Sequence, residues 1–286
     1  MPVSPDHRRV REDRTPPPTP AITTHHPPSP PAPATQWPMV GWYQPSQLIR
    51  TGIAVAISTI FGRHSDHRLV EAISTNGLEF YDYTCHYDED DQGRCEPDPS
   101  RPRQELWIDY VGDVGDGWHS TYAIASSLAR PRLRITRDIH GRTCDVHTER
   151  GHLLIFGGDE VYPTASREAY EQRLLGPYET ALRETTAPPY PHVFAIPGNH
   201  DWYDSLASFI RLFTSRRWFG GWRTRQHRSY FALRLPQRWW LLGTDVQLGS
   251  DIDRPQVQYF EHAATQIAQL DPGARIILCH AEPHWV

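Results

Sequence analysis

Four short polar runs, each placed directly after an apolar segment, constrain this chain more than any other feature of its sequence. The apolar segments are short and bounded by turn residues, as is typical of buried strands. Polar residues that follow such strands meet along one edge of a sheet, which is where α/β proteins place their chemistry. The four runs are Asp113-Val114-Gly115, Gly158-Asp159-Glu160-Val161-Tyr162, Gly198-Asn199-His200-Asp201 and Cys279-His280.

Strand-like and helix-like segments alternate along most of the chain, which predicts an α/β architecture. Short apolar or alternating runs predict strands at 105–111, 152–156, 192–196, 229–235, 238–244 and 275–279. The fourth and fifth of these flank Pro236-Gln237, so we expect them to form a hairpin. Helical periodicity predicts helices within 45–73 and at 120–129, 165–183 and 256–270, an amphipathic stretch covers 205–213, and residues 77–104 predict one or two further strands.

The chain divides into three parts by composition. Residues 1–40 are rich in Pro, Thr, Ser and His and lack periodic apolar residues, so we interpret them as a disordered tail. Docking of its prolines into an aromatic-lined groove is the alternative interpretation. Residues 41–104 are predicted to form a helical and β extension, and residues 105–286 form the domain that carries the four polar runs.

Charge and hydropathy exclude several classes of protein. The formal net charge is −5 and the only basic patch, at 216–228, is modest, so we predict no nucleic-acid-binding surface. No apolar signal-peptide core follows Arg8-Arg9. The longest apolar run, Gly52 to Phe61, is too short to span a bilayer and predicts a helix packed on protein or at an interface. We therefore expect a soluble, cytoplasmic protein.

The cysteines give no sign of a disulfide framework. They lie at positions 85, 95, 144 and 279 without CxxC spacing, so we expect reduced thiols, although Cys85 and Cys95 could pair. These two bracket the acidic segment 87–93, which lacks the alternating ligands and the terminal Glu of a calcium loop. We interpret that segment as a solvated loop.

The polar runs combine hard oxygen donors with imidazole, the donor mixture of metal sites that hydrolyse phosphate esters. A pair of metals needs one carboxylate that bridges ions about 3.5 to 4 Å apart, and Asp159 is the candidate bridge. Asp113 is the candidate ligand of the first ion. Asn199, through its amide oxygen, and His280, through its ring, are the candidate ligands of the second ion. The sequence thus predicts two divalent or trivalent ions, with iron, manganese and zinc as the options.

His200 and Asp201 are the candidate catalytic residues. His200 directly follows a candidate metal ligand, and we expect Asp201 to hold its ring. An imidazole in that position is suited to protonate a leaving alkoxide or to steady the transferring phosphoryl group. The next residues, Trp202 and Tyr203, are candidates for the wall of the pocket.

In their order and strand-end context, these residues resemble the calcineurin-like metallophosphoesterases. Gly112-Asp113-Val114-Gly115 and Asp159-Glu160-Val161-Tyr162 are similar to the purple acid phosphatase variant of the motifs. The resemblance covers about Trp107 to the end of the chain. It implies a four-layer α-β-β-α sandwich with a dinuclear site at the strand ends. It also implies Tyr162 as a metal ligand, and the alternative is that Tyr162, which precedes Pro163, only packs the loop.

One part of the family pattern is missing. The family places a Gly-His-x-His motif after the lone histidine, and no such motif follows His280 in the 286 residues. Three explanations remain open: the chain is a piece of a longer enzyme, His284 partly substitutes, or the site binds metal weakly. We expect the sandwich to be incomplete at the C-terminus.

The leading hypothesis is a phosphoesterase that hydrolyses phosphate-ester substrates by attack of a metal-bound hydroxide at the dinuclear site. The alternative is a non-catalytic remnant that acts as a binding or scaffold protein. A third interpretation treats His280 and His284 as a zinc pair, against which Pro283 and the absence of a metalloprotease Glu both argue. The sequence leaves the particular substrate and the oligomeric state open.

Overall fold

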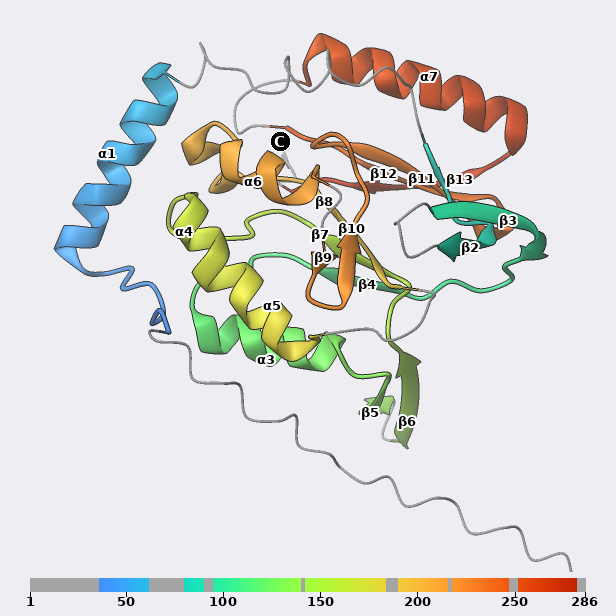
Figure 1. Cartoon of the computed structure of the whole chain (residues 1–286), viewed down its shortest axis with the longest axis horizontal. Helices are drawn as coiled ribbons and strands as arrows, with labels where there is room; N and C mark the ends of the chain where they lie inside the picture. The colour runs from blue at the N-terminus through green and yellow to red at the C-terminus, as the bar shows by residue number, and fades with distance from the viewer. Residues whose placement is uncertain are drawn as a thin grey trace, which may run out of the picture.

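The computed structural model describes residues 36–61, 80–89, 95–139, 142–183, 190–215, 218–246 and 252–281. Residues 1–35 of the predicted tail, part of the acidic segment and His284 lie outside the described residues. Within them, two β-sheets stack face to face, and helices cover the outer face of each sheet (Figure 1). The α-β-β-α layers expected for this chain are therefore present.

The five-stranded sheet supplies three of the four polar runs. Its order is β4-β7-β8-β10-β9. The first four strands are parallel, and the short edge strand β9 is antiparallel to its neighbour. The register aligns Val111 with Phe156 and Phe156 with Ala195, so β4, β7 and β8 end level and their following loops emerge side by side. The strands are β4 (Ile108–Val111), β7 (Leu153–Phe156), β8 (His192–Ala195), β9 (Trp218–Phe219) and β10 (Trp222–Thr224).

The four-stranded sheet supplies the fourth polar run. Its order is β1-β11-β12-β13, with strands β1 (Tyr81–Asp82), β11 (Phe231–Leu235), β12 (Trp239–Gly243) and β13 (Arg275–Cys279). Strands β11 and β12 form the predicted hairpin around a 3₁₀ turn, Pro236–Arg238. Strand β1 pairs in parallel with β11, so the extension that precedes the domain contributes a strand to the domain's own sheet.

Side chains of the strands alternate between two core layers, as the period of two requires. In β7, Leu153 and Ile155 face the second sheet, whereas Leu154 and Phe156 face the helices. Four helices form that outer layer: α3 (Trp118–Leu128), α4 (Arg167–Tyr170), α5 (Gly176–Ala181) and α6 (Ala207–Phe213). On the opposite side, α7 (Arg254–Leu270) packs on Trp240 of the second sheet (Figure 1).

The predicted helix at 165–183 is interrupted. Ser166 caps α4 by accepting a hydrogen bond from the backbone of Ala169, as a helix-starting serine should. A π-helical turn, Glu171–Leu175, then separates α4 from α5. Pro177 lies at the start of α5 and has no N–H to continue the α-helical hydrogen-bond pattern. The Gly176-Pro177 pair therefore accounts for the interruption.

Two antiparallel hairpins extend from the layers: β2 (Cys85–Glu89) with β3 (Cys95–Pro102), and β5 (Arg132–Ile139) with β6 (Arg142–Glu149). The second hairpin was not predicted from the sequence. In the first, the register pairs Cys95 with Glu89 and Cys85 with Pro102, and the Cys85 thiol is free. A Cys85–Cys95 disulfide is therefore not formed, because the two residues lie at opposite ends of the hairpin.

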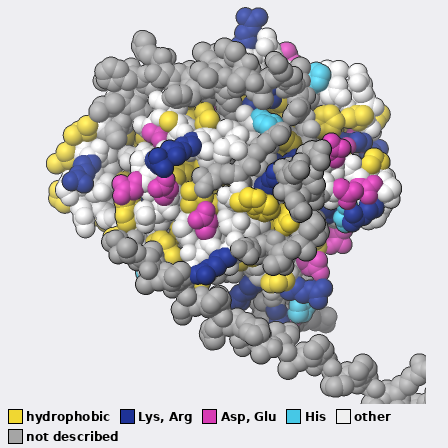
Figure 2. Space-filling view, viewed as in Figure 1, with side chains coloured by type: hydrophobic (Ala, Val, Ile, Leu, Met, Phe, Trp, Pro, Cys, Tyr) yellow, Lys and Arg dark blue, Asp and Glu magenta, His cyan; other side chains and the backbone are white. Residues whose placement is uncertain are grey.

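The N-terminal part of the described chain packs on the domain. Residues 36–40, which the sequence analysis places in the tail, contribute the buried Val40 and also Trp37, which packs against the helical core. The following helix, α1 (Pro45–Phe61), exposes several apolar side chains at the left edge of Figure 2. None of the helices in the described ranges has the length and apolarity that a membrane crossing requires.

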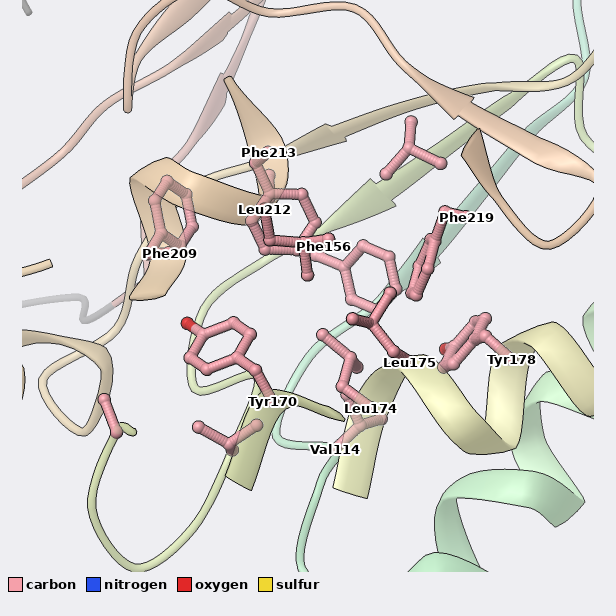
Figure 3. Packing of buried hydrophobic residues seen from close by; sticks show 14 of the residues in the cluster. Val114, Phe156, Tyr170, Leu174, Leu175, Tyr178, Phe209, Leu212, Phe213 and Phe219 are labelled. Carbon is pink, nitrogen blue, oxygen red and sulfur yellow. The ribbon is translucent and has the colours of Figure 1, made fainter. Parts of the chain in front are cut away.

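The core between the first sheet and its helices is aromatic. Phe156 is fully buried at its centre, and its ring lies 5.2, 5.7 and 5.9 Å from the rings of Tyr178, Phe213 and Phe219 (Figure 3). Phe156 is also the last residue of β7, three positions before Asp159. Its packing therefore fixes the end of the strand from which a candidate metal ligand emerges.

We predict that Phe156→Ala lowers the free energy of unfolding by about 3 to 5 kcal/mol, because it removes buried area and leaves a cavity among rigid rings. Ile124→Ala, on the exposed face of α3, should change it by no more than about 0.5 kcal/mol. Urea unfolding followed by circular dichroism measures both. Equal effects of the two substitutions would contradict the assignment of Phe156 to the centre of the core.

A second prediction concerns pH and His152, the residue directly before β7. Burial, followed by the nearby charge of Arg103, lowers the pKa of His152 from 6.5 to about 4. The neutral ring accepts a hydrogen bond at Nδ1 from the backbone of Trp107 (3.3 Å). Between pH 6.5 and about 4, His152 is protonated in the unfolded chain but stays neutral in the folded chain. The free energy of unfolding should therefore fall as the pH drops through this range.

The measurement is thermal unfolding of the wild type and of His152→Gln across that pH range. The wild type should lose more stability than the variant between pH 6.5 and 4, because glutamine does not titrate. Parallel profiles for the two proteins would show that His152 is not held neutral in the folded state.

Candidate active site

The strand-end loops of β4 and β7 hold each other through their backbones. Asp113 N donates to Gly158 O (3.1 Å), and Tyr162 N donates to Gly115 O (3.2 Å). Asp113 and Asp159 both adopt the left-handed conformation, with φ of 54° and 56°. Non-glycine residues persist in that region when the surrounding structure enforces it, and such residues cluster at functional sites. The two candidate carboxylates are thus placed by their loops and not by regular secondary structure.

Asp113, Asp159 and Tyr162 meet at one point. The Tyr162 hydroxyl lies 2.7 Å from Asp113 Oδ1 and 3.0 Å from Asp159 Oδ2. Burial and the two carboxylates raise the pKa of Tyr162 above its ordinary value. Burial, followed by the charge of Asp201, raises the pKa of Asp159 to about 6. Three oxygen donors from two loops therefore converge in a partly buried position.

His200 lies beside this oxygen cluster. Its backbone N–H donates to Asp159 Oδ1 (3.0 Å), and its ring packs against the Tyr162 ring at a centroid distance of 4.6 Å. Its Nδ1 lies 2.7 Å from Pro163 O. A carbonyl oxygen only accepts, so Nδ1 carries the proton and Nε2 is the nitrogen left for chemistry.

The expected contact between Asp201 and the His200 ring is not formed. The Asp201 carboxylate is fully buried and accepts hydrogen bonds from Gly198 N (2.9 Å), Glu160 N (3.3 Å) and the Tyr170 hydroxyl (2.6 Å). Those donors bind both oxygens of the Asp201 carboxylate. The hydrogen-bond partner of the His200 ring is Pro163 O instead. Asp201 ties the loop after β8 to the loop after β7 and to helix α4. The predicted role of Asp201 in holding the His200 ring is therefore wrong, because its carboxylate binds these three donors instead.

A second buried carboxyl lies next to Asp201. Glu160 is fully buried, and its Oε1 accepts a hydrogen bond from Gly158 N (3.2 Å). Burial, followed by the charge of Asp201, raises the pKa of Glu160 well above its ordinary value. A neutral Glu160 can lie beside the Asp201 carboxylate without charge repulsion. No residue pattern in the sequence predicts this arrangement.

Asn199 and His280 come to the same edge from two sheets. Asn199 precedes His200, whose backbone contacts Asp159. His280 follows β13, and its Nδ1 lies 3.2 Å from Oγ1 of Thr244, the residue directly after β12. The next residue, Ala281, lies against Gly158, where an added Cβ would come within 2.5 Å of the Ala281 Cβ. The C-terminal run therefore reaches the loop that carries Asp159.

Gly198 is required by the closeness of these loops. An added Cβ would lie 2.5 Å from Asp159 N and 2.6 Å from Asp159 Cγ. Only glycine lets the loop after β8 approach the candidate bridging carboxylate this closely.

Comparison with known families adds an independent observation. A family model described as calcineurin-like phosphoesterase matches residues 106–278, more than half of the chain. This chain belongs to the calcineurin-like phosphoesterase family. Searches of curated proteins and of solved structures find no match. The family match contains Asp113, Asp159, Tyr162 and Asn199 and stops before His280.

Members of the calcineurin-like phosphoesterase family are generally hydrolytic and typically bind two metal ions. Among the described residues, no cluster of three or more His, Cys, Asp and Glu side chains is arranged to hold a metal. The donors that do converge are two aspartates and a tyrosine, and hard oxygen donors of this kind suit manganese and ferric iron. These three oxygen donors are therefore of a type that such an ion accepts.

Trp42 is the site residue that the sequence analysis missed. Its ring lies 5.4 Å from the Tyr162 ring and 6.1 Å from the His200 ring. No local signal links a tryptophan at position 42 to motifs more than one hundred residues away. Only the stretch Trp37-Pro38-Met39-Val40, which is more apolar than a solvated tail, indicates that this segment packs on the rest of the protein.

We predict that Tyr170→Phe lowers the free energy of unfolding by about 1.5 to 3 kcal/mol, because it removes a hydrogen bond to the buried Asp201 carboxylate. Tyr178→Phe is the matched control, since Tyr178 lies in the same core and its hydroxyl has no hydrogen-bond partner among the described residues. Removing that unsatisfied hydroxyl should be neutral or stabilising. Urea unfolding measures the free energy of unfolding of both variants. A Tyr170→Phe variant as stable as the wild type would contradict the role given to Asp201.

Proposed function

We propose that this chain is a metal-dependent phosphoesterase that hydrolyses phosphate esters at a dinuclear site at the edge formed by the ends of β4, β7, β8 and β13. The observation that carries the proposal is the position of the Tyr162 hydroxyl, within hydrogen-bond reach of both Asp113 and Asp159. Two carboxylates and a phenol are hard oxygen donors of the kind that manganese and ferric iron accept, and the motifs that carry them resemble the purple acid phosphatase variant.

Each ligand has a distinct place in this proposal. Asp113 and Tyr162 would hold the first ion, Asp159 would bridge, and Asn199 and His280 would hold the second. When bound, such a pair of ions activates water as the nucleophile and stabilises negative charge on the phosphoryl oxygens. The ions are divalent or trivalent, with iron, manganese and zinc as the candidates.

In this proposal His200 transfers a proton and Asp201 positions the loop that carries His200. With Nδ1 fixed on Pro163 O, the His200 ring keeps one orientation, and Nε2 would be the nitrogen that meets a substrate. In the doubly protonated ring, Nε2 would carry a second proton and deliver it to the leaving oxygen of the ester, which leaves the ring neutral with its proton on Nδ1. Asp201 is a positioning residue, because its three hydrogen bonds fix the loop that carries Asn199 and His200.

The test is hydrolysis of p-nitrophenyl phosphate by the 286-residue chain with added manganese, iron or zinc. We predict metal-dependent turnover that falls by at least about 100-fold in Asp159→Asn and Asp113→Asn, since even outer-shell substitutions at metal sites cost 10- to 100-fold. Asp145→Asn, in the exposed β5–β6 hairpin, should keep wild-type activity.

Metal content provides a readout that is independent of turnover. Elemental analysis should find two ions per wild-type chain, and the iron-loaded protein should have a visible absorption band that Tyr162→Phe lacks. If the chain binds no metal and hydrolyses no ester under any of these conditions, the proposal is wrong and a non-catalytic binding protein is favoured.

A further inference from the structure

The segment before α1 lies across the loops of the candidate site. Trp118 N donates to Trp37 O (3.1 Å), and Val40 N donates to Asp116 O (3.0 Å). The indole N–H of Trp42 donates to Asp116 Oδ1 (3.1 Å). Asp116 follows Asp113 by three residues, so these bonds attach the segment to the loop that carries a candidate metal ligand.

Trp42 continues from this attachment to the other two loops. Its ring stands nearly perpendicular to the ring of Tyr162, at 73°, and to the ring of His200, at 83°. Tyr203 packs on the same histidine at 5.1 Å. The His200 ring is therefore surrounded by three aromatic side chains, of which Trp42 comes from outside the family-matched region.

Trp42 nevertheless keeps 39% of its surface open. The anchoring of the segment is carried by other groups: Val40 is buried, and Trp37 packs on the core with the Arg173 guanidinium 5.3 Å from the centre of its ring. An aromatic ring that is fixed by a hydrogen bond, contacts the proposed proton donor and stays partly open is suited to receive a ligand.

We propose, resting on the proposed function, that Trp42 is a specificity-determining residue that holds a flat aromatic leaving group, so that aryl phosphate esters are the preferred substrates. His200 would protonate the leaving oxygen, and the atoms attached to that oxygen must then lie beside the His200 ring. Trp42 is fixed at that place and offers open ring surface. Offset or edge-to-face pairing with a second ring stabilises an aryl group in a way that a small alkyl group cannot reproduce.

The kinetic experiment compares p-nitrophenyl phosphate with glycerol 2-phosphate in four proteins. In Trp42→Ala, the KM for the aryl ester should rise by about threefold to tenfold, the range expected for one aromatic pair, with kcat and the alkyl ester little affected. Trp42→Phe keeps a ring but loses the N–H that binds Asp116, and it should retain most of the preference. Tyr43→Ala, next in sequence and 96% exposed, should match the wild type.

A binding experiment makes the inference independent of turnover. The probes are phenylphosphonate and methylphosphonate, which are not hydrolysed, and the signal is the indole N–H resonance of Trp42, assigned by its loss in Trp42→Phe. Phenylphosphonate should shift this resonance at concentrations at which methylphosphonate does not. That result supports the inference even if no hydrolysis is ever detected, so the two proposals fail separately.

Three outcomes would overturn the inference. Equal losses on both esters in Trp42→Ala would assign Trp42 a structural role, and unchanged kinetics would assign it none. An indole resonance that neither phosphonate moves, or that both move equally, would show that no aryl group rests on this ring.

Discussion

The level ends of β4, β7 and β8 are the constraint on which the site depends. Parallel strands paired in register release their following loops at one edge, and here those loops are joined by backbone hydrogen bonds from Asp113 to Gly158 and from Tyr162 to Gly115. The side chains that meet there come from three loops of one sheet, and His280 reaches the same edge from the second sheet. Such a convergence holds only while the buried strands and their aromatic core remain packed.

The buried carboxylate of Asp201 converts this arrangement of loops into a fixed geometry. It collects backbone donors from the loops after β7 and β8 and a hydroxyl from helix α4. Hydrogen bonds to a buried charge are individually strong, and loss of one partner leaves the others uncompensated. The aspartate that ends the Gly-Asn-His-Asp run is therefore needed for the placement of its neighbours and does not itself contact the histidine ring.

The sequence predicted most of the architecture because the decisive signals are local. Strand β13 was expected at 275–279 and found there, and the β11–β12 hairpin follows directly from its turn residues. The Gly176-Pro177 pair could have predicted the interruption of the helix at 165–183. The strand-end motifs also predicted which polar residues would emerge at the same edge, since sheet topology brings strand ends together.

Features that depend on contacts between distant segments could not be predicted in this way. The hydrogen-bond partner of the His200 ring is the backbone carbonyl of Pro163. Because every residue has a backbone carbonyl, the residue type at position 163 does not predict this contact. The three donors to Asp201 are likewise set by how two loops and a helix meet. Trp42 contacts Tyr162 and His200 because the N-terminal segment packs across the domain. No pattern in a single sequence predicts that packing.

We propose that Asp113, Asp159 and Tyr162 form the first half of a two-metal site. Anomalous diffraction from crystals grown with manganese is the direct test of this claim. We predict two peaks about 3.5 to 4 Å apart, with Asp159 between them and the Tyr162 oxygen bonded to one. An absence of peaks among these side chains, or manganese bound only elsewhere on the protein, would contradict the claim.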